Sequence, residues 1–275
     1  MNALRRIESW PSEHAAAGVA RASGVVAVGG DVEHEFALAS VTKLFTAYAT
    51  LVAVEEAAVG VDDAAGPEGS TIRHLLSHAS GLGPDGAVLS RPERTRIYSN
   101  AGINLLAREV GERTGIAFAD YLTEAVLRPL ELGAELRGEP AEGMVGTVGD
   151  LLAFGRELLE PRLISRETLD EATSVQFPGL RGVLPGFGRM EPNDWGLGFE
   201  LRDGKSPHWT GTRNSPDTFG HFGSKAGSAT FLWVDRAAGL ACAGLADVDF
   251  GAWAKEAWPA LADAVLSEGS RAAAG

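Results

Sequence analysis

The sequence has 275 residues, of which 45% are hydrophobic and 22% charged, a composition typical of globular proteins. This length suffices to bury a core without disulfides, and the single cysteine, Cys242, excludes an intrachain disulfide. The net charge of −13 argues against a nucleic-acid or anionic-membrane partner, because both are bound through clustered Lys and Arg. No apolar segment follows the arginines of Met1–Trp10, and no stretch of about 18 apolar residues occurs. We therefore expect no signal peptide, no membrane partner and a cytoplasmic location.

Hydrophobic patterning predicts strands near both ends of the chain and helices between them. In chain order we expect two strands within Ala17–Asp31; helices over Ala37–Ala58, Thr71–His78, Asn100–Thr114, Ala117–Leu127, Val148–Leu159 and Ser165–Thr173; strands over Trp195–Leu201, Ala229–Asp235 and Leu240–Ala246; and a helix over Ala252–Leu266. The small-residue tail Gly269–Gly275 is the one segment that does not look globular. This order predicts an α/β (α+β) fold whose sheet is assembled from both termini, with an inserted helical lobe.

We expect a single domain over residues 1–275. Its sheet lobe would comprise about residues 1–50 and 195–275, and its helical lobe about residues 51–194. Ligand sites favour the clefts between such lobes, so we look there for the chemistry.

The first candidate motif is Ser40-Val-Thr-Lys43. A serine hydroxyl is a weak nucleophile that needs a neighbouring group to take its proton. A spacing of three residues on a helix places Ser40 and Lys43 on one face, and a lysine can act as a base where burial lowers its pKa. The backbone N–H of Ser40, close to the helix start, is a candidate oxyanion donor. Taken alone, the string is more typical of an N-cap serine followed by a solvated lysine.

Two further motifs carry polar groups suited to acyl chemistry. Tyr98-Ser-Asn100 precedes a predicted helix, and a phenol near a lysine can shuttle a proton while the asparagine amide holds a substrate carbonyl. His221-Phe-Gly223 is followed by Ser224. The glycine permits close approach of a substrate, His221 is a candidate hydrogen-bond donor to substrate, and the Ser224 N–H is a second candidate oxyanion donor. Taken alone, the first string is also typical of a helix N-cap with a packing tyrosine, and the second is more typical of a histidine in a glycine-rich turn.

Together the three motifs resemble those of the serine β-lactamase, penicillin-binding-protein and family VIII esterase superfamily, in particular its class C-like branch. Flanking segments resemble that branch as well, over about residues 20–265: Phe36-Ala-Leu-Ala-Ser-Val-Thr-Lys-Leu-Phe45, Thr71-Ile-Arg-His-Leu-Leu-Ser-His-Ala-Ser-Gly-Leu82, Tyr98-Ser-Asn-Ala-Gly-Ile-Asn-Leu-Leu106, Met144-Val-Gly-Thr-Val-Gly-Asp-Leu-Leu-Ala-Phe-Gly155 and Trp195-Gly-Leu-Gly-Phe199. The resemblance implies a β-lactamase-like fold with an antiparallel sheet flanked by helices.

The resemblance also implies roles for the motif residues. Ser40 would be the acylated nucleophile, Lys43 its proton partner, Tyr98 the general base and acid, and Asn100 a substrate-orienting residue. On the opposite wall, His221, Phe222, Gly223 and Ser224 would bind substrate, with the N–H groups of Ser40 and Ser224 as the oxyanion hole. No metal or other cofactor is implied.

The sequence departs from the family pattern in two places. Penicillin-handling members usually carry Lys-Thr-Gly where this chain has His221-Phe-Gly223, and a neutral histidine is a poorer anchor for the substrate carboxylate. Lys225 is close enough in sequence to compensate, but its direction on a strand is open. The segment Leu132–Met144 is short, which predicts less cover over the cleft and room for a bulky acyl group.

We expect esterase-like hydrolysis of a small or medium acyl substrate, with oligomeric state undetermined. The same machinery serves β-lactamases, D-amino peptidases and biosynthetic transacylases, and these remain alternatives. A non-catalytic binding module of the same fold is a further alternative. A metal site at His74 and His78, four residues apart on a predicted helix, is disfavoured because no third ligand is evident.

Overall fold

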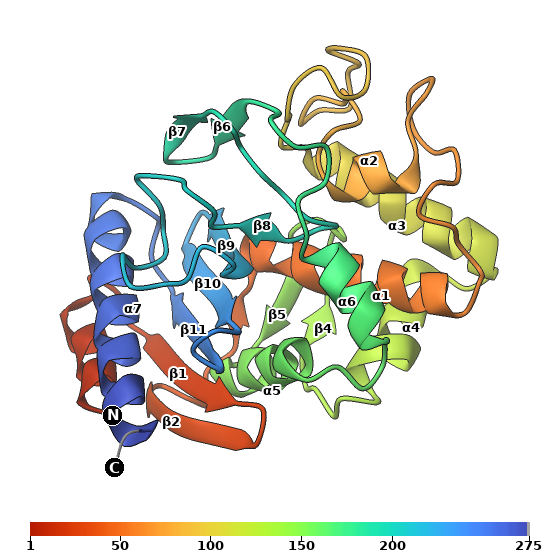
Figure 1. Ribbon diagram of the computed structural model, residues 1–275. Helices are drawn as coiled ribbons and strands as arrows, with labels where there is room; N and C mark the ends of the chain where they lie inside the picture. Colours follow the sequence, from red (N-terminus) through yellow and green to blue (C-terminus); the bar gives the residue numbers. More distant parts are fainter. Residues whose placement is uncertain (274–275) are drawn as a thin grey trace.

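A six-stranded antiparallel sheet forms the centre of the molecule in the computed structural model, which describes residues 1–273 (Figure 1). Its strand order is β2-β1-β11-β10-β9-β8. The strands are β1 (Ala15–Arg21), β2 (Gly24–Gly30), β8 (Glu200–Leu201), β9 (Phe219–Lys225), β10 (Ser228–Asp235) and β11 (Leu240–Ala246). The N-terminal hairpin joins the C-terminal strands through β1 and β11, with Gly18 opposite Ala243. The prediction of a β-lactamase-like, antiparallel sheet assembled from both termini is confirmed.

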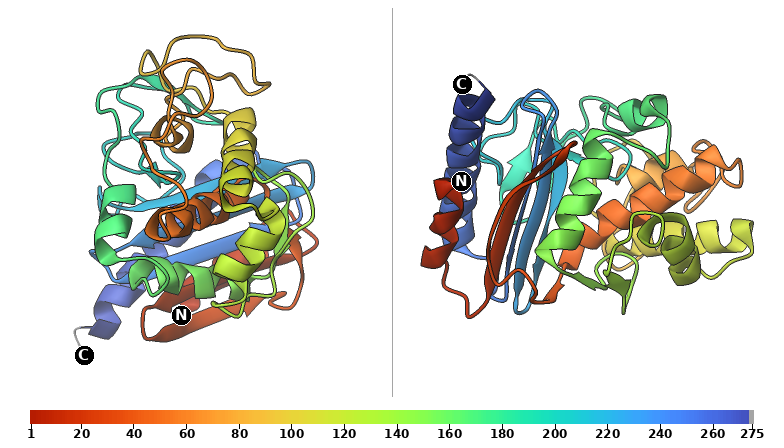
Figure 2. Two further views of the ribbon diagram at one scale, coloured as in Figure 1. Left: turned by 90° about the vertical axis from the view of Figure 1, so that its right-hand side faces the viewer. Right: turned by 90° about the horizontal axis from the view of Figure 1, so that it is seen from below.

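Helices cover both faces of this sheet (Figure 2). On one face lie the C-terminal helix α7 (Ala252–Ala273) and the N-terminal 3₁₀ helix η1 (Asn2–Ser9). On the other face α5 (Val148–Leu159) packs against β1 and β11, although its residues fall within the range expected for the helical lobe. The contact is close: a Cβ added at Gly155 would lie 2.8 Å from that of Ala241. Helix α7 also includes most of the small-residue tail, residues 269–273. Residues 274–275 lie outside the described part of the chain.

The remaining helices extend from the α5 side of the sheet (Figure 2). They are η2 (Ala39–Val41), α1 (Thr42–Glu55), α2 (Ile72–Leu76), α3 (Asn100–Thr114), α4 (Phe118–Leu122), the π-helical η3 (Thr123–Leu127) and α6 (Arg166–Ala172). Local signals set several of their ends. Ser165 caps α6 by accepting from the N–H of Thr168, as expected, and α3 ends at Gly115 with φ of 73°.

The predicted strand Trp195–Leu201 is mostly wrong, because only Glu200 and Leu201 are strand residues. Gly198 has φ of 84°, and a Cβ there would lie 2.1 Å from the Cβ of Ala47 on α1. The segment is therefore a turn pressed against α1 rather than an extended strand, and its glycines permit this contact.

Two small sheets complete the fold: β3 (Phe36–Ala37), β5 (Met144–Gly146) and β4 (Glu135–Leu136) form one, and β6 (Gly182–Leu184) and β7 (Gly188–Met190) form the other. In the first sheet β5, which begins at the end of the short segment, pairs with β3, a few residues before Ser40. Cys242 is buried in β11, as its apolar surroundings predict. Within residues 1–273, the helices are all too short or too polar to cross a membrane.

Candidate active site

Ser40 lies in the 3₁₀ turn η2, immediately before α1, rather than inside a helix that begins at Ala37. The preceding residue, Ala39, has φ of 46°, a left-handed conformation that is strained for an alanine and common at functional sites. Strand β10 is hydrogen-bonded to this turn: the hydroxyl of Thr230 donates to the carbonyl oxygen of Leu38 over 2.9 Å. The turn is thus fixed by contacts distant in sequence, and it presents a half-buried Ser40 side chain.

Lys43 contacts Ser40 as the helical spacing predicts. Its Nζ donates to Oγ of Ser40 over 2.9 Å and to the carbonyl oxygen of Ala141 over 2.8 Å. The side chain is 1% exposed, and this burial lowers the pKa of Lys43 from 10.5 to about 7, while the charge of Glu142 acts in the opposite direction. A large fraction of Lys43 is therefore neutral at physiological pH, which is the state that accepts a proton.

Tyr98 is placed by its neighbours at the start of α3. Ser99 caps this helix by accepting from the N–H of Gly102, and buried Arg96 donates to the carbonyl oxygens of Ser77 and Asn193. The Nζ of Lys43 lies 4.8 Å from the centre of the Tyr98 ring. Burial raises the pKa of Tyr98 above its ordinary value, and an interaction with the Ser40 hydroxyl opposes this rise only in part. The phenol is therefore protonated at neutral pH.

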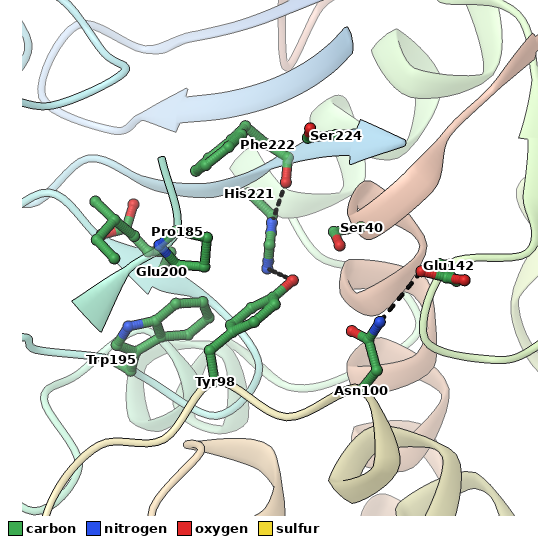
Figure 3. A pocket seen from close by; sticks show the side chains of 11 residues that line it. Ser40, Tyr98, Asn100, Glu142, Pro185, Trp195, Glu200, His221, Phe222 and Ser224 are labelled. Atoms are coloured by element: carbon green, nitrogen blue, oxygen red, sulfur yellow. Dashed lines mark hydrogen bonds between the residues drawn. The ribbon is translucent and has the colours of Figure 1, made fainter. Parts of the chain in front are cut away.

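His221 on β9 has both ring nitrogens engaged (Figure 3). Its Nδ1 lies 2.6 Å from the carbonyl oxygen of Phe222, which can only accept, so Nδ1 carries the proton. Its Nε2 consequently accepts from the hydroxyl of Tyr98, 3.4 Å away. Burial lowers the pKa of His221 to about 3, so the ring is neutral. The expected donation from His221 to substrate is not available in this arrangement, because the ring orients Tyr98 instead.

Gly223 brings strand β9 against the turn that carries Ser40. A Cβ at this position would lie 2.5 Å from the carbonyl oxygen of Leu38 and 3.0 Å from the Cβ of Ala39. The glycine is thus required by close approach of the two backbones, and it places the next residue, Ser224, at the pocket. Lys225 is exposed at the end of β9 and is not among the residues lining the pocket.

Asn100 bonds to an acidic residue that the sequence motifs do not identify. Its Nδ2 donates to Oε2 of Glu142 over 3.1 Å, and its Oδ1 is buried without a partner among the described residues. Glu142 sits in the turn before β5, within the short segment of Leu132–Met144. Sequence reasoning missed Glu142 because it reaches the site only through contacts between distant segments.

These residues surround one pocket of about 220 Å³ (Figure 3). Its lining consists of Ser40, Tyr98, Asn100, Glu142, Leu184, Pro185, Trp195, Glu200, His221, Phe222 and Ser224. The expected site residues thus come together, with Lys43 and Gly223 directly behind the wall. The cavity is smaller than the roughly 300–1,000 Å³ of drug-sized sites, so it suits a small acyl group and corrects the expectation of room for a bulky one.

A buried ionic network supports the inner end of the pocket. Glu200 is 1% exposed and pairs with Lys205 and with Nε2 of His208 at 2.9 Å, and it accepts from the indole N–H of Trp209 over 2.7 Å. Burial alone would raise the pKa of Glu200, but the two basic partners hold it at about 2. The carboxylate of Glu200 is therefore already satisfied by Lys205, His208 and Trp209, which do not line the pocket.

The two histidines considered as metal ligands make separate structural contacts. Nδ1 of His74 accepts from the N–H of Thr71 over 3.2 Å in a capping box, and Nε2 lies 3.1 Å from Glu93. Nδ1 of His78 accepts from the N–H of Ser99 over 3.3 Å, and its ring packs on that of Tyr98 with centroids 4.7 Å apart. His78 thereby helps to position the tyrosine.

Comparison with known proteins identifies the family and the fold. The Beta-lactamase family model matches residues 12–134 and 131–266. A solved structure described as a beta-lactamase from Mycobacterium bovis is 51% identical, with a TM-score of 0.94 over 97% of this chain and 99% of that one.

Two more distant structures share the fold. A D-amino acid amidase from Ochrobactrum anthropi SV3 is 17% identical with a TM-score of 0.78, covering 97% of this chain and 99% of that one. A D-stereospecific amidohydrolase from Streptomyces sp. is 20% identical with a TM-score of 0.69, covering 90% and 93%. No curated protein sequence matches the chain significantly. From the family match and the 51% identical structure, we conclude that the chain belongs to the beta-lactamase family of serine hydrolases.

Proposed function

We propose that the protein is a serine acyl hydrolase that forms an acyl-enzyme on Ser40 and acts, in the manner of an esterase, on a small acyl substrate. The observation that carries the proposal is the 2.9 Å contact between Oγ of Ser40 and the Nζ of a buried Lys43 whose pKa is about 7. A nucleophile in direct contact with a base of matched pKa is the arrangement that nucleophilic catalysis requires.

In the acylation step Oγ of Ser40 attacks the substrate carbonyl carbon, and its proton passes to neutral Lys43. The bond from oxygen to carbon forms as the carbonyl becomes an oxyanion. The N–H groups of Ser40 and Ser224, two residues that line the same pocket, would hold this oxyanion. A donor of this kind lowers the barrier by about 3 kcal/mol in other serine hydrolases.

Collapse of the tetrahedral intermediate breaks the bond to the leaving group, which needs a proton unless it is a stable anion. We assign this proton to Tyr98, because burial keeps the phenol protonated and Lys43 ammonium, beside its ring, can replace the proton afterwards. This assignment keeps the acid part of the base-and-acid role that the resemblance implies for Tyr98 and gives the base part to Lys43. Water then attacks the acyl carbonyl while Lys43 accepts its proton. Collapse of this second intermediate breaks the bond to Oγ, which takes the proton from Lys43, so that the acid leaves and Ser40 is restored.

The pocket lining argues for an ester over a penicillin. Among its described residues it has no lysine or arginine, and its histidine is neutral, so a penicillin carboxylate would find no cation there. β-Lactam hydrolysis is the second candidate, since the 51% identical structure is described as a beta-lactamase. A non-catalytic binding module would turn over neither of these substrates, and peptidase and transacylase activities are alternatives that share the same acyl-enzyme.

The test is steady-state hydrolysis of a p-nitrophenyl ester of a short acid and of a penicillin, by the wild type and by Ser40→Ala. We expect turnover of the ester, slower turnover of the penicillin and loss of both in Ser40→Ala. Penicillin turnover that exceeds ester turnover would favour the second candidate. Unchanged ester turnover in a folded Ser40→Ala variant would overturn the proposal.

A further inference from the structure

Among the described residues, a carboxylate that forms no ion pair lines the pocket beside Ser40. Glu142 receives one hydrogen bond, from Nδ2 of Asn100, and within residues 1–273 no ion pair joins it to Lys, Arg or His. It contrasts with Glu200, whose charge is compensated by Lys205 and His208. Asn100 is the first residue of α3, whose N-terminus favours a negative charge nearby.

The turn that carries Glu142 is anchored to the catalytic elements. The carbonyl oxygen of Ala141 accepts from Lys43, and its N–H donates to Oδ1 of Asn104 over 2.9 Å. One residue earlier, the carbonyl oxygen of Pro140 accepts from the hydroxyl of Thr46 on α1 over 2.6 Å. These bonds fix the backbone next to Glu142 relative to Ser40 and Lys43. Its carboxylate therefore has a defined position in the pocket lining.

A second acceptor lies next to this carboxylate. Because a carboxylate only accepts, Nδ2 of Asn100 must face Glu142, and Oδ1 must face the other way. In Figure 3 this oxygen points toward the Tyr98 side of the pocket. It is buried without a hydrogen-bond donor among the described residues, which is uncommon for a polar atom. The second oxygen of Glu142 and Oδ1 of Asn100 are thus two neighbouring acceptors without a donor, and they suit a ligand that carries several N–H groups.

The other groups of the pocket leave its charge negative. His221 is neutral and Tyr98 is protonated, since burial lowers the pKa of the first to about 3 and raises that of the second. When Lys43 is in the neutral form that accepts the Ser40 proton, Glu142 carries an uncompensated charge. A cationic group on the substrate would supply the missing counter-charge.

We propose that Glu142 and Asn100 bind an ammonium group on the acyl part of the substrate, so that the preferred substrates are aminoacyl esters or amides with a small side chain. This inference rests on the proposed function and narrows its substrate class. The ammonium would donate to the free oxygen of Glu142 and to Oδ1 of Asn100. The apolar wall of Leu184, Pro185 and Trp195 would contact the small side chain.

The test compares benzyl esters of small acids that differ in charge. D- and L-alanine benzyl esters carry the ammonium, the benzyl ester of isobutyric acid is nearly isosteric and neutral, and monobenzyl succinate is anionic. We measure kcat/KM of each with wild type, Glu142→Gln and Glu139→Gln, below the pKa of the ester amine. Glu139 is an exposed residue of the same turn, so its variant removes an equal charge outside the pocket.

For the wild type we expect the better alanine enantiomer to exceed the neutral ester by about tenfold to a hundredfold, the range of a charged hydrogen bond. In Glu142→Gln this ratio should fall to about one, and in Glu139→Gln it should match the wild type. Any effect of Glu142 on Lys43 acts on both esters and cancels in the ratio.

Two results would overturn the inference while leaving the proposed function intact. One is Ser40-dependent hydrolysis with no preference for the cationic ester. The other is a preference that survives in Glu142→Gln. Failure to hydrolyse any of the esters would instead contradict the proposed function itself.

Discussion

The hydroxyl of Tyr98 donates to Nε2 of His221 over 3.4 Å, and the ring is held in that tautomer by the 2.6 Å contact of Nδ1 with the carbonyl oxygen of Phe222. A histidine with its single proton bonded to the backbone cannot donate to substrate from Nε2. It therefore acts as a positioning residue for the phenol. At 3.4 Å this hydrogen bond is long, so the phenol proton must turn from His221 to reach a leaving group, and the donor role of Tyr98 is testable.

Replacement of Tyr98 by phenylalanine should slow the hydrolysis of esters to an extent that depends on the leaving group. An alkyl ester needs a proton on its departing oxygen, so its kcat should fall about 10²- to 10⁴-fold, the usual contribution of general acid catalysis. A p-nitrophenyl ester of the same acid leaves as a stable anion and should lose far less. The comparison of kcat for the two esters is the measurement, and equal losses would contradict the donor role.

The pH dependence of kcat/KM should report Lys43. The base must be neutral, and burial lowers the pKa of Lys43 to about 7, so activity on a p-nitrophenyl ester should rise with pH through a midpoint near 7. Because the charge of Glu142 raises the pKa of Lys43, Glu142→Gln should move this midpoint to lower pH. A profile that is flat through neutral pH, or a midpoint that moves upward, would rule out Lys43 as the base.

Lys43→Met should stabilise the fold, most strongly at low pH. Lys43 has a pKa of about 7 when folded and about 10.5 when unfolded, so the unfolded chain binds more protons between these values and wild-type stability rises with pH across them. The advantage of the methionine variant should shrink by roughly 3 kcal/mol between about pH 6 and about pH 9.5. Urea unfolding at both pH values measures this difference. A stability difference that does not change with pH would show that burial does not lower the pKa of Lys43, contrary to this account.

Gly223→Ala should damage both the fold and the site. Its Cβ would overlap the carbonyl oxygen of Leu38, and such overpacking typically lowers the free energy of unfolding by about 1–3 kcal/mol. Gly204→Ala is a matched control, because a Cβ at that exposed turn meets no atom within 4 Å. We expect thermal unfolding and ester turnover to suffer in the first variant alone. Equal behaviour of the two variants would show that β9 does not position the Ser40 turn.

Local patterns were sufficient to predict much of this architecture. Helical spacing predicts the contact of Ser40 with Lys43, and continuous apolar runs bounded by turn residues predict β10 and β11 to within one residue. The exact bounds of α3 follow from its cap at Ser99 and its end at Gly115. Each of these features depends on residues close together in sequence.

The remaining features depend on contacts between distant segments. Glu142 enters the pocket because Ala141 and Pro140 bind side chains of α1 and α3, and no periodicity marks that turn. The bend that brings Trp195 to the pocket depends on the contact of Gly198 with Ala47. The protonation of Tyr98 and His221 depends on burial, which a motif does not specify.

The most direct test of the central claim is intact-protein mass spectrometry of rapidly quenched mixtures of the protein with a p-nitrophenyl ester, followed by peptide mapping. We predict a mass increase equal to one acyl group, located on the peptide that contains Ser40 and absent in Ser40→Ala. A fluorophosphonate should label the same residue. Hydrolysis without an adduct on Ser40, or an adduct on another residue that persists in Ser40→Ala, would contradict the account.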